Sequence, residues 1–253
     1  MVDVSTWARK HGTTTRLYLT DSYIKKTFAS VADYICERND RCYVILDKTI
    51  LHPKSGGQSS DTGTIQNNNL ELKVTKVMEV DDVLVHYGKL LSGELNVGER
   101  VGVLVDWEQR YNIMKNHTAG HIIDYALLLT YKRNVNTFEA SHGPSESYVA
   151  YEADMPSAEM LREIELLANK ITKEAREVKA IWVPRKDLQG VLYNAPNLLR
   201  LPERDFYRVV EIQGINAMPC TGTHVKNTGE IKEIKITKAE PHLNGYKLFY
   251  IAR

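Results

Sequence analysis

The residues best suited to chemistry begin with two histidines, His117 and His121, in the sequence HTAGH. Residues four apart in a helix lie one turn apart on the same face. Two imidazoles placed in this way can bind one metal ion, with Zn–N distances of about 2.0–2.1 Å. The chain contains eight histidines, so this pair alone is a weak signal, and an isolated HxxxH on an apolar helix face is more often structural.

A second pair, Cys220 and His224, lies in the sequence CTGTH. Gly222 between two threonines, with Pro219 just before the cysteine, favours a turn. Three imidazoles and a thiolate favour zinc over magnesium or calcium, and the metal would lower the pKa of the thiol. The presence of both pairs in one chain is a more specific signal of a metal site than either pair alone. Their spacing leaves open whether the zinc is structural, closed by four protein ligands, or catalytic.

The elements that must position these residues change in character near residue 105. Residues 13–105 contain several short segments rich in β-branched and aromatic residues, separated by turn-like stretches, and this pattern predicts a closed or nearly closed barrel. Residues 22–39 are an exception, because their apolar spacing predicts a short helix.

Beyond Trp107 the apolar residues recur with a helical period. One predicted helix runs from Glu108 to about Tyr131 and carries both histidines on its apolar stripe. A second runs from about Pro156 to Val178, and later segments such as YRVVEIQG and EIKEIKITKAE predict strands. The predicted fold class is therefore α+β. It comprises a β-barrel domain, residues 1–105, and an α+β domain, residues 106–253, with long helices packed on a mainly antiparallel sheet.

Charge and composition limit the classes of partner. The net charge is +1 and the pI about 7.7, which argues against charge-driven RNA binding over the whole surface but not against local phosphate contacts. The 14 tyrosines could stack on unpaired bases. Two loose basic runs are candidates for phosphate binding or are solvated faces: Lys173, Arg176, Lys179, Arg185 and Lys186, then Lys226, Lys232, Lys235 and Lys238.

Location and redox state follow from what the sequence lacks. No apolar run approaches the roughly 20 residues of a membrane helix, and the N-terminus has no apolar signal core, so we expect a cytoplasmic protein with no membrane partner. The chain has three cysteines, an odd and sparse number. We therefore expect reduced thiols, with Cys36 and Cys42 as ordinary buried or half-buried residues.

Three segments carry a resemblance to a known family. VDWEQRYNIMKNHTAGHIIDYAL resembles the start of the editing domain of alanyl-tRNA synthetases and AlaX proteins, and MPCTGTHVKNTGEI resembles the second motif of that domain. HPKSGGQSSDTGTI resembles the glycine-rich segment of the family's N-terminal barrel. The segments occur in the family's order and cover essentially the whole chain. Threonyl-tRNA synthetases share the two metal motifs, but the glycine-rich segment of the barrel indicates alanyl-tRNA synthetases and AlaX proteins instead. The sequence therefore resembles the AlaX family.

The resemblance implies a zinc-dependent aminoacyl-tRNA deacylase that serves translation fidelity without ATP. Its substrate would be mischarged tRNA(Ala), carrying serine or also glycine, with no obligate protein partner. The short stretch after the second motif implies a medium-length form. The zinc would be held by His117, His121, Cys220 and His224.

Three positions depart from the family's usual pattern. Ser55 and Ser59 replace a glycine and a proline of the glycine-rich segment, and Thr221 replaces a glycine that the synthetases usually carry. None is a proposed metal ligand. The departures therefore bear on loop shape and amino-acid selectivity more than on the metal.

Two threonines next to the predicted ligands are candidate catalytic residues. Thr118 follows His117, and Thr223 precedes His224. Either hydroxyl could bind the hydroxyl of a misattached serine and so discriminate against alanine, which would leave a buried polar group unpaired. The alternative for Thr118 is a hydroxyl bonded back to a carbonyl within its own helix.

The glycine-rich segment supplies the candidate substrate-binding residues Gly56, Gly57 and Gln58. Glycines allow the backbone to approach a ligand closely, so this loop could close over the site, although a plain hairpin turn of the barrel is the alternative. Asp61 and His142 are further candidates.

Two other functions remain open at this level. The chain could be a tRNA-binding module with a structural zinc, or a zinc hydrolase of small esters. If it edits, the zinc could activate water or position the substrate, and the terminal hydroxyl of the tRNA could help to position the water.

Overall fold

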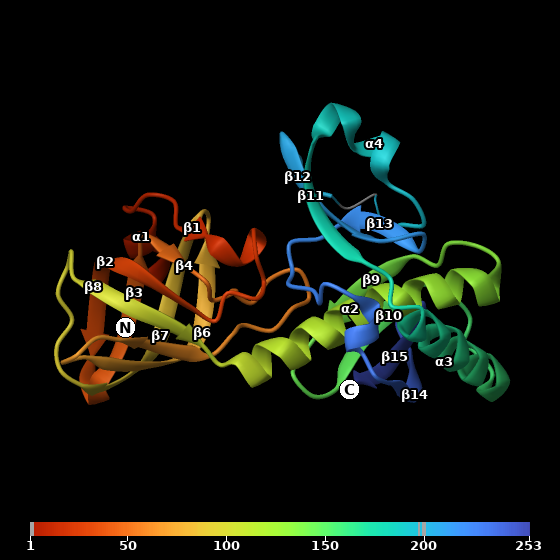
Figure 1. Ribbon diagram of the computed structural model, residues 1–253, viewed down its shortest axis with the longest axis horizontal. Helices are drawn as coiled ribbons and strands as arrows, with labels where there is room; N and C mark the ends of the chain where they lie inside the picture. The colour runs from red at the N-terminus through yellow and green to blue at the C-terminus, as the bar shows by residue number, and fades with distance from the viewer. Residues whose placement is uncertain (1–2, 197, 199–200) are drawn as a thin grey trace. The chain divides into compact units, whose positions relative to one another are not determined.

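The chain forms two compact units (Figure 1). The computed structural model describes residues 3–196, 198 and 201–253. The first unit runs to Ser55 and resumes over Ser59–Arg110, and the second combines Gly56–Gln58 with Tyr111–Arg253. Within the described part of the chain, no helix has both the length and the apolar character needed to span a membrane.

The first unit is a closed antiparallel barrel of six strands, as the sequence predicts. Alternate residues point inward and form its core, among them Val31, Val44, Leu72 and Val103. In their order around the barrel, the strands are β2 (Lys26–Glu37), β3 (Arg41–Leu46), β7 (Val83–Ser92), β6 (Glu71–Val80), β5 (Gly63–Gln66) and β8 (Arg100–Val105). Short elements accompany it: α1 (Val4–Ala8), β1 (Thr15–Arg16), η1 (Leu17–Leu19), η2 (Arg38–Asp40) and β4 (Lys48–Thr49).

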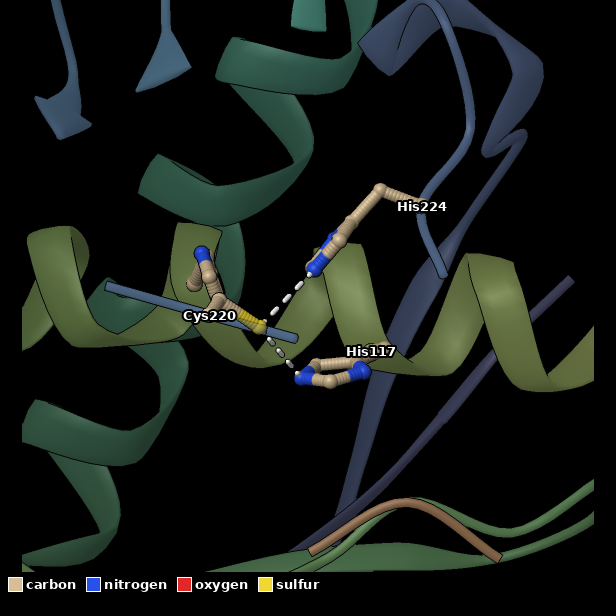
Figure 2. Close-up of side chains that lie close together, drawn as sticks. His117, Cys220 and His224 are labelled. Atoms are coloured by element: carbon tan, nitrogen blue, oxygen red, sulfur yellow. Dashed lines mark hydrogen bonds between the residues drawn. The ribbon is translucent and has the colours of Figure 1, made fainter. Parts of the chain in front are cut away.

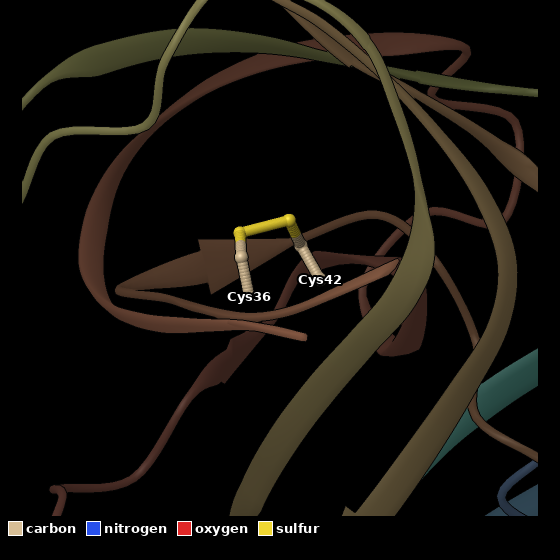
Figure 3. The surroundings of a disulfide bond; sticks show 2 residues. All are labelled: Cys36 and Cys42. Carbon is tan, nitrogen blue, oxygen red and sulfur yellow. A yellow bond between two sulfur atoms is a disulfide. The ribbon is translucent and has the colours of Figure 1, made fainter. Parts of the chain in front are cut away.

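Two predictions for this unit are wrong. The segment expected to be helical within residues 22–39 is mostly β2, which pairs with β3 on one side and β8 on the other. Ala29 and Val31 point into the core at a spacing of two, so cross-strand pairing overrides a weak helical pattern. The expected reduced thiols are instead a disulfide between Cys36 and Cys42 (Figure 3). The β2–β3 register places these residues directly opposite each other, with Cα atoms 4.1 Å apart.

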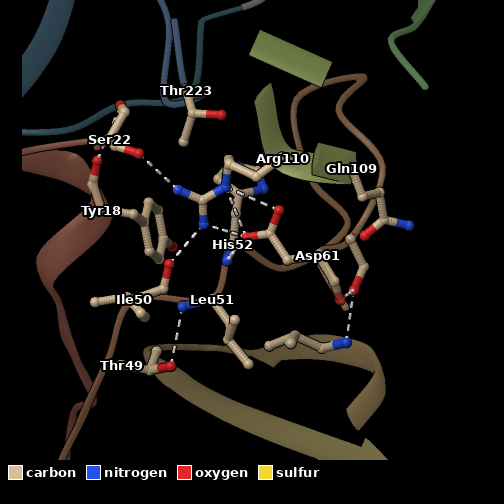
Figure 4. A network of polar contacts seen from close by, with 12 residues as sticks. Tyr18, Ser22, Thr49, Ile50, Leu51, His52, Asp61, Gln109, Arg110 and Thr223 are labelled. Atoms are coloured by element: carbon tan, nitrogen blue, oxygen red, sulfur yellow. Dashed lines mark hydrogen bonds and ion pairs between the residues drawn. The ribbon is translucent and has the colours of Figure 1, made fainter. Parts of the chain in front are cut away.

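Asp61 takes part in a buried ion pair with Arg110, near the end of the first unit (Figure 4). Both side chains are fully buried, and Arg110 Nε donates to both carboxylate oxygens of Asp61, at 2.9 and 3.0 Å. The guanidinium also donates to the carbonyls of Ser22 and Ile50. These bonds satisfy a charge that would otherwise be costly to bury, which makes Asp61 a structural residue of the barrel.

The long helix that the sequence predicts is α2 (Trp107–Tyr131). Its first turn belongs to the first unit, and the rest of the helix, from Tyr111, belongs to the second. Asn116 ties α2 to a four-stranded antiparallel sheet, because its side-chain Oδ1 accepts from Ala252 N and its backbone carbonyl accepts from Tyr250 Oη. The sheet order is β14 (Ile234–His242), β15 (Gly245–Ala252), β10 (Ser147–Tyr151) and β9 (Thr137–Ser141).

The second predicted helix is present as α3 (Ala158–Lys173) and ends sooner than expected. Ser157 caps it by accepting from Met160 N, and Asn169 bonds to the backbone of Ile234 in β14. A three-stranded antiparallel sheet then follows, β11 (Val178–Pro184), β12 (Phe206–Ile212) and β13 (Asn216–Pro219), with η3 (Arg185–Asp187), α4 (Leu188–Val191) and η5 (Thr228–Glu230). The α+β class is thus confirmed, and this unit brings α2 and the end of β13 together.

Candidate functional site

The four side chains singled out by their spacing meet in the second unit. One ligand atom from each, a nitrogen or the sulfur, lies within 4.8 Å of the other three. Cys220 Sγ is 3.4 Å from His117 Nε2 and 3.3 Å from His224 Nε2 (Figure 2). His117 and His121 come from consecutive turns of α2, and Cys220 and His224 from the turn after β13. Two distant stretches of sequence therefore form one cluster.

Local backbone interactions hold the second pair in place. One nitrogen of the Arg208 guanidinium donates to the carbonyls of Cys220 and Gly222, at 2.8 and 3.0 Å, and so fixes the turn. A side chain at Gly222 would overlap the His117 imidazole and approach Gln58 Oε1 to 2.7 Å. The turn needs glycine here because the imidazole occupies the space that a Cβ would fill.

Each of two imidazoles has a partner on the nitrogen that points away from the cluster. His117 Nδ1 lies 3.0 Å from Gln58 Oε1, and because an amide oxygen only accepts, the imidazole donates. His224 Nδ1 lies 3.1 Å from Thr118 Oγ1. Bonds of this kind fix the tautomer and ring orientation of metal-binding histidines, and they leave both Nε2 atoms directed at the sulfur.

The chemistry of this donor set fits a borderline-soft divalent ion such as zinc. Within the described residues, His121 Nδ1 is buried without a hydrogen-bond partner. A buried polar atom of this kind needs an explanation, and binding of a metal ion by this imidazole would provide one. Burial, with Arg208 adding to it, lowers the pKa of His121 to about 4, so the ring is neutral at pH 7 and can ligate. Burial raises the pKa of the Cys220 thiol, so a thiolate there requires a cation beside it.

The predicted loop residues lie against the cluster. Gln58 Oε1 also accepts from Thr223 N at 2.8 Å, and Gln58 Nε2 donates to Thr223 Oγ1 at 2.9 Å. The carbonyl of Gly57 accepts from His142 N at 2.7 Å, and Gly56 lines the adjoining pocket. The structure thus brings the glycine-rich segment next to the ligands, while its role in binding substrate stays a prediction.

A pocket of about 270 Å³ opens beside the four ligands. Its wall combines polar groups with apolar side chains, and includes His117, His121, Cys220, Asp124, Val149 and Met218. Thr118 and Thr223 are fully buried and absent from the described lining. Their hydroxyls bond to His224 and Gln58 instead, so the predicted contact with a serine hydroxyl remains untested.

His142, a weaker candidate from the sequence, forms part of this wall. Its ring stacks on His117 with centroids 4.2 Å apart and planes 16° from parallel. Burial lowers the pKa of His142 to about 3, with His121 adding to the effect, so the ring is neutral. Tyr250 Oη donates to Asn116 O and therefore accepts from His142 Nδ1, at 2.9 Å. His142 supports the His117 ring from one side.

Sequence reasoning missed Asp124, the acidic member of the pocket wall. It follows His121 by three residues, so helical periodicity alone places both on one face of α2, and that signal could have identified it. Burial raises the pKa of Asp124 to about 7, opposed by a hydrogen bond from Tyr151.

Much of the basic character singled out for phosphate binding is engaged within the protein. At least five of the nine residues form ion pairs with neighbouring carboxylates: Arg176–Glu174, Lys179–Glu177, Arg185–Glu203, Lys235–Glu165 and Lys238–Glu240. The basic runs therefore resemble solvated, locally balanced faces more than a dedicated RNA surface.

Comparison with known proteins covers both units. Residues 10–109 match the family of class II (A) tRNA synthetases, and residues 207–245 match the second additional domain of threonyl and alanyl tRNA synthetases. The chain is 34% identical to the alanine–tRNA ligase of Ignicoccus hospitalis, over 92% of this chain and 25% of the ligase. It therefore spans only about a quarter of that ligase.

Shorter relatives match over most of their length. The chain is 34% identical to the alanyl-tRNA editing protein AlaX-M of Saccharolobus solfataricus, over 94% of this chain and 98% of that protein. It is 33% identical to AlaX-M of Methanosarcina acetivorans, over 88% and 92%. With this identity and coverage, and with both metal motifs in one cluster, the chain belongs to the AlaX family of alanyl-tRNA editing proteins.

Proposed function

We propose that this chain is a zinc-dependent hydrolase that acts in trans on mischarged tRNA(Ala), releasing serine, and also glycine, from the tRNA. The observation that carries the proposal is the cluster of three imidazoles and one thiol, with ligand atoms within 4.8 Å, beside a pocket. The relatives named alanyl-tRNA editing proteins support the choice of substrate.

The reaction breaks the ester between an amino acid and a ribose hydroxyl. It needs a water nucleophile and stabilisation of the oxyanion that develops. Zinc held by His117, His121, Cys220 and His224 would supply Lewis acidity for polarising the carbonyl or for acidifying water. Apolar side chains of the pocket wall, including Val149, would lie against the ester and limit its contact with bulk water.

Other residues of the chain act through these ligands. Gln58 holds the His117 ring through Nδ1, and Thr118 holds the His224 ring in the same way. We assign both as positioning residues, and Thr223 as the residue that orients Gln58. A pocket of about 270 Å³ is smaller than typical sites for drug-sized ligands, which suits a seryl or glycyl group better than a bulky one.

The test is a deacylation assay on Ser-, Gly- and Ala-charged tRNA(Ala), with metal content measured on the same sample. We expect stoichiometric zinc, rapid loss of serine and sparing of alanine. Free seryl esters serve as a parallel substrate, and equal turnover of these would indicate a hydrolase of small esters. Zinc-loaded protein that leaves Ser-tRNA(Ala) intact would overturn the proposal.

One observation favours a second function, a tRNA-binding module with a structural zinc. The cluster offers four protein side chains, and four protein ligands around a zinc ion are the usual form of a structural site. Cys220→Ala separates the two functions. In a structural site it should unfold the second unit, whereas in the hydrolase it should abolish turnover while circular dichroism stays close to that of the unchanged protein.

A further inference from the structure

Asp124 is placed to contact whatever occupies the pocket. It lies on α2 one turn beyond His121 and is the only carboxylate among the described residues that line the pocket. Its side chain is half-buried, so part of it faces the cavity. It lies outside the group of four whose ligand atoms converge. Its position therefore indicates a contact with substrate rather than with the ion.

One oxygen of this carboxylate is held and the other is available. Tyr151, fully buried on β10, donates to Asp124 Oδ1 at 2.7 Å. Among the residues that the structure describes, no hydrogen bond reaches Oδ2. A carboxylate oriented by one bond, with a second oxygen open, can accept a strong hydrogen bond from a cationic group.

Among the residues that the structure describes, no cationic side chain pairs with this carboxylate. Desolvation is the largest influence on its pKa, raising it to about 7, and the bond from Tyr151 only partly offsets this. Buried carboxylates normally pair with a cation. The missing partner would therefore arrive with the ligand.

The proposed substrate carries such a group. An aminoacyl ester has an amino group on the carbon next to the carbonyl, and in its protonated form this group is a compact cation with three donors. We propose that Asp124 binds the α-ammonium group of the aminoacyl ester and so selects aminoacyl over acyl groups that lack an amine. The inference rests on the proposed editing function and makes Asp124 a specificity-determining residue of that site.

The decisive comparison removes the amine from the substrate. Ser-tRNA(Ala) and 3-hydroxypropionyl-tRNA(Ala) differ only in the α-amino group. A hydrogen bond to a charged group contributes about 1.5–3 kcal/mol, so kcat/KM for the seryl form should be at least about tenfold higher. Asp124→Asn, whose Oδ1 can still accept from Tyr151, should lose this preference. Asp154→Asn, an exposed position, should keep it.

Two outcomes would overturn the inference. An amine preference that survives in Asp124→Asn would place amine recognition elsewhere. An equal loss of kcat on both substrates, with the preference intact, would make Asp124 an acid–base group instead. If no form of the protein deacylates Ser-tRNA(Ala), the proposed function itself fails.

A binding measurement on the unmodified protein provides a check that needs no variant. The probes are non-hydrolysable amides of 3′-amino-3′-deoxyadenosine carrying either a seryl or a 3-hydroxypropionyl group. By calorimetry the zinc-loaded protein should bind the seryl amide about tenfold more tightly or better. Equal affinities would contradict a role for Asp124 in amine recognition, even if Ser-tRNA(Ala) is hydrolysed.

Discussion

Gly222 is important for the geometry of the proposed metal site because it has no side chain. The His117 imidazole occupies the space that a Cβ at this position would fill. Gly222→Ala would drive a methyl group into the His117 imidazole, so we expect the variant to lose most of its zinc and its deacylase activity. Metal analysis and the tRNA assay measure the effect. Gly190→Ala is the matched control, because nothing lies within 4 Å of a Cβ at that position. Full zinc occupancy in the Gly222 variant would contradict the described turn.

Gln58 connects the glycine-rich segment to the cluster through one hydrogen bond to His117 and two to Thr223. Gln58→Ala removes the acceptor for His117 Nδ1, and the loss of such an outer partner typically lowers metal affinity about 10–100-fold. Competition with a chromogenic chelator gives the affinity. The exposed Gln189→Ala provides the comparison, and an affinity no different from that of the control would show that Gln58 does not support the metal.

For single residues, the sequence predicts contacts between side chains that are close in sequence. It does not predict contacts between residues that are far apart in sequence. His117 with His121, and Cys220 with His224, are visible because four-residue spacing has a fixed geometric meaning. Thr118 could be named as a polar neighbour of the site, but its bond to His224 joins residues 106 positions apart. No local pattern encodes a contact of that separation.

Among the structural elements, the barrel depends on the ion pair between Asp61 and Arg110. Asp61→Asn leaves a fully buried guanidinium without its counter-charge, a change that costs about 3–5 kcal/mol. Urea denaturation should show this loss in the free energy of unfolding. Asp81→Asn removes an exposed pair with Arg9 and should change stability little. Similar effects of the two variants would argue against a structural role for Asp61.

His86, on β7, makes the stability of the barrel depend on pH. It is fully buried, with ring nitrogens bonded to Val44 O and Thr49 Oγ1, and burial lowers its pKa to about 4 from an ordinary 6.5. The unfolded chain therefore takes up the proton first. The free energy of unfolding should fall as pH drops from about 6.5 to 4, by at most about 3 kcal/mol from this residue.

The measurement is urea denaturation at pH 7 and pH 5 for the unchanged chain and for His86→Gln. The variant lacks the titrating ring, so its stability should vary less between the two pH values. An identical pH dependence in both proteins would mean that His86 does not contribute.

The elements themselves were predictable where composition and period agreed. The barrel strands and both long helices have clear patterns, whereas β2 has a mixed one and was predicted to be helical. The pairing of Cys36 with Cys42 depends on the register of two strands, which counting cysteines could not provide.

At the scale of the whole molecule, removal of the metal should lower the stability of the second unit and leave the stability of the barrel unchanged. The four ligands belong to Tyr111–Arg253, while the barrel has its own core. Exhaustive chelation should abolish deacylation and weaken protection from hydrogen exchange in the second unit, with the barrel amides little changed, and added zinc should restore both. Equal loss of protection in the two units would contradict this division.

Gln58 and Thr223 are 165 positions apart in sequence yet share two hydrogen bonds. A nascent chain on the ribosome exposes its glycine-rich loop early, then both α2 histidines, and the Cys220 thiol only after β13 has emerged. Any product of interrupted synthesis that stops before Cys220 contains only two of the four proposed ligands. If the proposed function is correct, such a fragment would not deacylate charged tRNA, and activity would appear only after the segment with Cys220 and His224 has been made.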